Sequence, residues 1–140
     1  MPLATLRLTA AHRDAMLAHV RQAWPQEACG LLGGRPGQVE RVYCVENVLH
    51  SPVAYYMDPT AQVQAMLELE AAGWDVCGIF HSHPAGPAVP SATDVAQAYY
   101  PEAVYVIFAP ATPETPETWG MRGFEIDNGR VREITLMVAE

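Results

Sequence analysis

The sequence predicts one α/β domain in which a mixed β-sheet is flanked by about three helices. Strand-like segments of apolar residues recur along the chain, and stretches with helical periodicity separate some of them. The length of 140 residues suits a single domain over residues 1–140, which can bury a core without disulfide bonds. Half of the residues are hydrophobic and 17% are charged, as is typical of a globular protein.

The first half of the chain supplies strands and two helices. A strand is expected near residues 3–8, and Thr9 can cap a helix that runs to about Trp24. Two strands, CGLLGG and VERVYCVEN, follow as a hairpin joined by a turn at residues 33–37. The pair Asp58-Pro59 then marks the start of a second helix, which we expect to end at Gly73.

The second half of the chain begins with the strand VCGIFHSH, after which Ser91 opens a third helix to about Tyr100. The continuous apolar run AVYVIFAP is typical of a central strand. We expect an exposed loop over residues 109–118, because Pro, Thr and Glu cannot bury much surface. The last two strands, MRGFEID and RVREITLMV, are predicted to form a hairpin with a type I′ turn at Asn128-Gly129.

Charge and cysteine content restrict the function classes. The formal net charge of −8 argues against a nucleic-acid partner. Three cysteines, without CxxC spacing, indicate free thiols and a reducing compartment. We find no signal peptide, and no apolar run approaches the roughly 20 residues of a membrane span. We therefore expect a cytoplasmic protein without a membrane partner, and the sequence leaves its oligomeric state open.

The segment GIFHSHPAGPAVPSATD, residues 78–94, gathers side chains that bind metals. Side chains alternate along a strand, so His81 and His83 lie on one face with Cβ atoms about 6.5–7 Å apart. Pro84 ends the strand, and Asp94 follows in the first turn of the next helix. Two imidazoles and a carboxylate leave a fourth position open, as in catalytic zinc sites.

The same residues also allow simpler interpretations. Ser91 and Asp94 have the spacing of a capping box, and paired histidines on a strand are often ordinary half-buried residues. Taken alone, the residues leave packing, capping and metal binding all open. His12 and His19 share a helix face without a third ligand, and His50 has no evident partner, so packing or surface positions are expected for them.

Two motifs resemble those of a known family. HSHP at residues 81–84, then PS at 90–91 and Asp94, is similar to the HxHP…PSxxD signature of the JAMM (MPN-plus) zinc metalloproteases. Upstream, PQEACGLLGG at residues 25–34 resembles the family's other landmark. The resemblance implies the JAMM/MPN (cytidine-deaminase-like) fold. It also implies roles for five residues: zinc ligands at His81, His83 and Asp94, the acid that deprotonates the zinc-bound water at Glu27, and an oxyanion stabiliser at Ser91.

The resemblance further implies a zinc-dependent peptidase or isopeptidase with one Zn²⁺ per chain. Substrates in that family are ubiquitin-like or sulfur-carrier β-grasp proteins, cut after their C-terminal Gly-Gly tail, and the short chain resembles the small prokaryotic branch. Two alternatives stay open: a non-catalytic binding module of the same fold, and a cysteine peptidase that uses Cys29. A zinc deaminase is disfavoured because its H-x-E and P-C-x-x-C motifs are absent. The complete ligand set favours an active enzyme.

Overall fold

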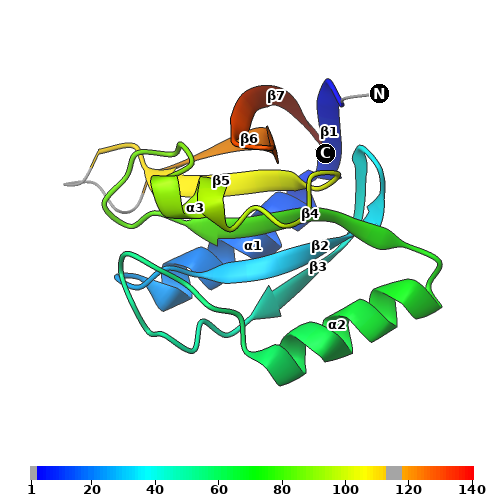
Figure 1. Cartoon of the computed structure of the whole chain (residues 1–140), viewed down its shortest axis with the longest axis horizontal. Coiled ribbons are helices and arrows are strands. Elements are labelled where there is room, and N and C mark those ends of the chain that lie inside the picture. The colour runs from blue at the N-terminus through cyan, green and yellow to red at the C-terminus, as the bar shows by residue number, and fades with distance from the viewer. Residues whose placement is uncertain (1–2, 113–117) are drawn as a thin grey trace.

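The strands of the computed structural model, which describes residues 3–112 and 118–140, form a mixed sheet that closes on itself (Figure 1). Its order is β1-β3-β2-β4-β5-β6-β7, and a parallel pairing of β7 with β1 completes the ring. The strands are β1 (Thr5–Thr9), β2 (Cys29–Arg35), β3 (Gln38–Val45), β4 (Asp75–Ser82), β5 (Val104–Pro110), β6 (Trp119–Asp127) and β7 (Arg130–Ala139). The helices are α1 (Ala10–Ala23), α2 (Pro59–Ala71) and α3 (Ala92–Ala96). The predicted mixed α/β sheet is confirmed, whereas its closure was not anticipated.

Alternating side chains of β2 and β4 divide the core into two parts. Leu32 and Phe80 pack in one cluster with Met16 and Val20 of α1. The intervening residues, among them Leu31, point to the second cluster, which contains Ala65 and Leu69 of α2. In Figure 1, α1 passes behind β2 and β4 while α2 lies at the lower edge of the view. β2 and β4 are thus covered on both faces, which holds their ends in fixed positions.

The predicted caps and turns are largely confirmed. The Thr9 hydroxyl accepts a hydrogen bond from the His12 amide at 3.1 Å, at the start of α1. Asp58 precedes Pro59 at the start of α2, although its side chain makes no capping hydrogen bond. Asn128 and Gly129 have φ values of 51° and 79°, as a type I′ turn requires.

Three predicted boundaries are wrong. The third helix ends at Ala96 instead of reaching Tyr100, because none of its residues is buried and Pro101 disfavours helical geometry at Tyr100. The β2–β3 turn is shorter than residues 33–37, because β2 continues to Arg35 through a bulge at Gly33/Gly34. The expected exposed loop at 109–118 starts too early, because Ala109 and Pro110 are buried residues of β5. Ala111 and Thr112 are exposed, and residues 113–117 lie outside the described residues. Among residues 3–112 and 118–140, no helix is long and apolar enough to cross a membrane.

Gly30 of β2 tests how tightly the core is packed. A Cβ atom there would lie 2.3 Å from Cε1 of Phe80 and 2.4 Å from the Tyr43 carbonyl oxygen. We expect Gly30→Ala to lower the free energy of unfolding by about 1–3 kcal/mol or more, because the main chain at Tyr43 and the buried Phe80 ring must both move. Urea denaturation followed by circular dichroism measures this change.

Gly120→Ala in β6 is the matched control. The nearest atom to a Cβ there is the Ala109 carbonyl oxygen at 3.8 Å, so the change should stay within about 0.5 kcal/mol. Equal effects of the two substitutions would contradict the described packing.

Candidate metal centre

The end of β4 brings two histidines to the same face. His81 lies on β4, opposite Cys29 of β2, and its side chain is fully buried. The His83 amide donates to the Phe108 carbonyl at 2.8 Å, which keeps the chain extended for one more residue. Pro84, which follows, has no amide hydrogen with which to continue the ladder. His81 and His83 therefore project to one side, as the sequence predicts.

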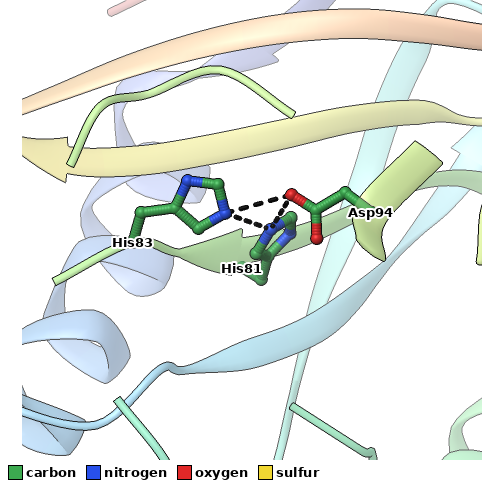
Figure 2. Close-up of side chains that lie close together, drawn as sticks. All are labelled: His81, His83 and Asp94. Atoms are coloured by element: carbon green, nitrogen blue, oxygen red, sulfur yellow. Dashed lines mark hydrogen bonds and ion pairs between the residues drawn. The ribbon is translucent and has the colours of Figure 1, made fainter. Parts of the chain in front are cut away.

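The first turn of α3 supplies the carboxylate. The Asp94 amide donates to the Ser91 hydroxyl at 3.0 Å, and the Ser91 amide donates to Oδ2 of Asp94 at 2.9 Å. This predicted capping box fixes the Asp94 rotamer, with Oδ2 facing the two imidazoles (Figure 2). The cap thus orients Asp94 toward the histidines, so capping and metal binding are compatible.

The three side chains converge on a small volume. Nε2 of His81 and Nε2 of His83 are 3.0 Å apart, and they lie 3.2 and 3.1 Å from Oδ2 of Asp94. Two ligands of a tetrahedral zinc, with bonds of about 2.0–2.1 Å, are separated by about 3.3 Å. The donor set and its spacing therefore fit one zinc ion. Within the described residues this is the one such group of His, Cys, Asp or Glu.

Contacts behind the histidines set their orientation. Nδ1 of His83 lies 2.8 Å from the Pro87 carbonyl, to which only a protonated nitrogen can donate. The neutral ring then carries its lone pair on Nε2, which is the atom that faces the centre. On the other side, the Tyr55 ring packs against His81 with centroids 4.8 Å apart. The structure thus adds Pro87 and Tyr55, which no sequence motif singled out.

Charge coupling within the group is strong. Burial alone would raise the pKa of Asp94, but the hydrogen bonds with His81 and His83 lower it well below its usual range. Burial lowers the pKa of His81. For His83, burial also acts to lower the pKa, but the interactions with Asp94 and the Pro87 carbonyl outweigh it and raise the pKa. The lowered pKa keeps Asp94 ionised as a carboxylate, the form in which it can bind a metal cation.

Glu27 approaches the centre from the segment just before β2, which begins at Cys29. The antiparallel register pairs Cys29 with His81, and two hydrogen bonds between Ala28 and Ser82, at 2.8 and 3.1 Å, continue it. One further step places Glu27 opposite His83. Its residue surface is only 5% exposed. Burial raises the pKa of Glu27 to about 7, with His83 acting to lower it and Asp94 to raise it.

Ser91 is exposed and lies beside Asp94 through the capping box. Its oxygen accepts the Asp94 amide, which leaves the hydroxyl proton available for another acceptor. All five residues singled out in the sequence are therefore linked to this end of β4, three of them in direct side-chain contact.

The remaining histidines have other contacts. His12 takes part in the cap of α1, and His19 Nε2 lies 3.1 Å from the Cys29 carbonyl. His50 is exposed and lies 3.5 Å from Glu46, so it has a partner that the sequence did not reveal. Cys29 is fully buried, and burial raises the pKa of its thiol to about 12. A thiol in that state is a poor nucleophile, which argues against a cysteine peptidase.

Residues 9–122 match the family described as prokaryotic homologues of the JAB domain. The chain belongs to this family. A solved JAB1/MPN-domain protein from Archaeoglobus fulgidus has the same fold, with a TM-score of 0.60 and 19% identity over 96% of this chain and all of that one. A solved protein from Desulfitobacterium hafniense is more similar, with a TM-score of 0.83 and 41% identity over 96% of this chain and 93% of that chain.

Three relatives carry names that describe their activity. The desampylase of Haloferax volcanii is 39% identical, over 85% of this chain and 91% of its own length. A probable TtuB-protein conjugate cleaving protease from Thermus thermophilus is 40% identical, over 86% and 74%. The CysO-cysteine peptidase of Mycobacterium tuberculosis is 37% identical, over 91% and 86%.

Substitution of the converging side chains should weaken zinc binding. Substitution of a residue that only contacts a metal ligand typically lowers metal affinity by roughly 10–100-fold. We expect His83→Ala and Asp94→Asn, which alter the ligands themselves, to lower zinc affinity by more than this. Asp94→Asn retains an oxygen for the Ser91 amide, so capping is largely preserved. Competition with a zinc-binding dye measures the affinity.

His50→Ala, in an exposed loop position, is the control and should bind zinc as the unsubstituted chain does. Wild-type affinity in both His83→Ala and Asp94→Asn would contradict a metal centre at this place.

Proposed function

We propose that this chain is a zinc-dependent peptidase or isopeptidase that cleaves after the C-terminal Gly-Gly tail of a ubiquitin-like or sulfur-carrier β-grasp protein. The observation that carries the proposal is the convergence of the ligand atoms of His81, His83 and Asp94, which lie 3.0–3.2 Å apart, with the buried Glu27 in the segment just before β2. Membership of the JAB family and the names of the three relatives, all hydrolytic, support it.

His81, His83 and Asp94 would hold one zinc ion and keep the remaining position open to solvent and substrate. Bound zinc supplies Lewis acidity, which polarises a carbonyl oxygen and makes water more acidic. His83 is held in the ligating tautomer by the Pro87 carbonyl, and Asp94 by the Ser91 cap. These contacts fix the ligands before the ion arrives, which limits the loss of side-chain freedom on binding.

Glu27 would act as the general base and then as the acid that protonates the leaving amine. Its pKa, raised by burial to about 7 before a cation is present, is suited to exchanging protons near neutral pH. The positive charge of an ion nearby would lower this pKa, so the carboxylate is ionised and ready to accept a proton. Ser91 would donate its hydroxyl proton to the negative charge that develops on the carbonyl oxygen.

A non-catalytic module of the same fold is the competing proposal. It is less well supported, because a binding surface has no need of a buried carboxylate with a raised pKa opposite a histidine pair. We further propose that residues 1–140 form one domain and that the chain works in the cytoplasm, where its three free thiols would stay reduced.

A panel of β-grasp proteins, each fused through its Gly-Gly terminus to a reporter, tests the activity. The zinc-loaded chain should cleave at least one fusion after the second glycine, as mass spectrometry of the products would show. Chelation should stop the reaction and added zinc should restore it. Cleavage that is indifferent to chelation, or none across a panel that includes CysO-like, TtuB-like and archaeal modifier proteins, would contradict the proposal.

Two variants separate the catalytic roles in this assay. Glu27→Gln should bind zinc normally and lose roughly 10²–10⁴-fold in kcat, because it removes the base without changing the shape of the side chain. Cys29→Ala should keep its activity, since the thiol takes no part in the proposed chemistry.

Ser91 combines a cap with a proposed oxyanion donor, and two substitutions distinguish these roles. Ser91→Gly removes the hydroxyl but costs a helix start only a few tenths of a kcal/mol. It should lower kcat by roughly 10²–10³-fold, whereas Ser91→Thr, which keeps a hydroxyl, should stay within about tenfold. Steady-state kinetics on the cleaved fusion measures both. A fully active Ser91→Gly would leave Ser91 with the capping role alone.

A further inference from the structure

The segment between β3 and α2, here called the 47–57 loop, closes on itself at its base. Asn47 and Met57 form an isolated antiparallel bridge. Beside it, the Val48 amide donates to the Tyr56 carbonyl at 3.0 Å. The loop is therefore anchored where it leaves β3, next to the strand that follows Glu27.

The Asn47 side chain uses its full hydrogen-bonding capacity on main-chain groups. Nδ2 donates to the carbonyls of Glu27, at 3.0 Å, and Ala54, at 3.1 Å. Oδ1 accepts from the amides of Leu49, at 3.1 Å, and Tyr56, at 3.0 Å. The residue is only 7% exposed, and its bond to the Glu27 carbonyl is fully buried, whereas the other three are partly buried. An amide supplies two donors and two acceptors at once, which no carboxylate can do.

Glu27 is held on both sides of its α-carbon by this loop. Its amide donates to the Ser51 carbonyl at 2.8 Å, and its carbonyl accepts from Nδ2 of Asn47. The next residue, Ala28, is bonded to Ser82 of β4. The main chain that carries the Glu27 carboxylate is thus clamped between the loop and the strand that carries His81.

The side-chain amide of Asn47 also holds the segment that covers His81. Asn47 binds the carbonyl of Ala54 and the amide of Tyr56, the two residues that flank Tyr55. The Tyr55 ring packs on the His81 imidazole, with 4.8 Å between centroids and 32° between planes. One buried side chain therefore connects the proposed base with the residue that packs against a proposed metal ligand.

We propose that Asn47 is a positioning residue for catalysis: it fixes the Glu27 main chain and the Tyr55 segment relative to β4. This inference rests on the proposed hydrolytic function for its kinetic consequences, but not for its structural ones. Asn47 itself contacts no reacting group.

Asn47→Asp tests the inference with little change in size. The carboxylate cannot donate to the Glu27 and Ala54 carbonyls and repels both oxygens. In the zinc-loaded full chain, kcat on the cleaved fusion should fall roughly 10–100-fold, as for other residues that orient ligands, while KM changes less than about threefold. In the metal-free full chain, hydrogen exchange at the Glu27 amide should accelerate at least about tenfold, because its acceptor, the Ser51 carbonyl, lies in the loop that loses the two donations of Asn47.

Asn128→Asp is the matched control. It makes the same substitution and charge change at an exposed turn with φ of 51°, a conformation that aspartate tolerates. Both kcat and the exchange of the Glu27 amide should match the unsubstituted chain. If Asn47→Asp fails to fold, Asn47→Ser keeps one hydrogen-bond donor and can replace it. The changes in kcat and amide exchange should then have the same direction and a smaller magnitude.

The outcomes separate this inference from the proposed function. Wild-type kcat per folded, zinc-loaded molecule in the Asn47 variants would overturn the positioning role, even if their melting temperature fell. Unchanged amide exchange would overturn the proposed anchoring. If the unsubstituted chain cleaved no fusion, the proposed function would fail, yet the exchange measurement on metal-free protein would still decide the anchoring.

Discussion

The antiparallel register between β2 and β4 is the constraint on which the site depends. Because Cys29 pairs with His81, extending the register by two residues places Glu27 opposite His83, where β2 begins and β4 ends. A shift by one residue would turn the buried carboxylate to the other face of the sheet, away from the histidines. Core packing on both faces of these strands, against α1 and α2, maintains the register.

Local contacts orient the residues that the register of β2 and β4 brings together. A capping box directs Asp94 toward the histidines, the Pro87 carbonyl selects the tautomer of His83, and Asn47 secures the main chain of Glu27. None of these contacts adds a reacting group. Together they restrict the motion of the groups that would react, which is what keeps catalytic distances short.

The sequence predicts the parts of this site that follow from local rules. Strand alternation places His81 and His83 on one face, and the Ser91–Asp94 spacing predicts the cap. Glu27 emerged only through the family resemblance, because its position depends on strand pairing that no local pattern specifies. The same limit applies to the closure of the sheet by β1 and β7, and to the contacts of Asn47, Tyr55 and the Pro87 carbonyl. The third helix was predicted too long: none of the residues of α3 is buried, and Pro101 disfavours helical geometry at Tyr100.

We propose that one zinc ion binds between β4 and α3, with Glu27 beside it but not bound to it. Anomalous diffraction at the zinc edge, from crystals of the zinc-loaded chain, shows where the ion lies. We expect one strong peak within bonding distance of Nε2 of His81, Nε2 of His83 and a carboxylate oxygen of Asp94. A peak at the cysteines instead, or no peak between these three side chains, would contradict it.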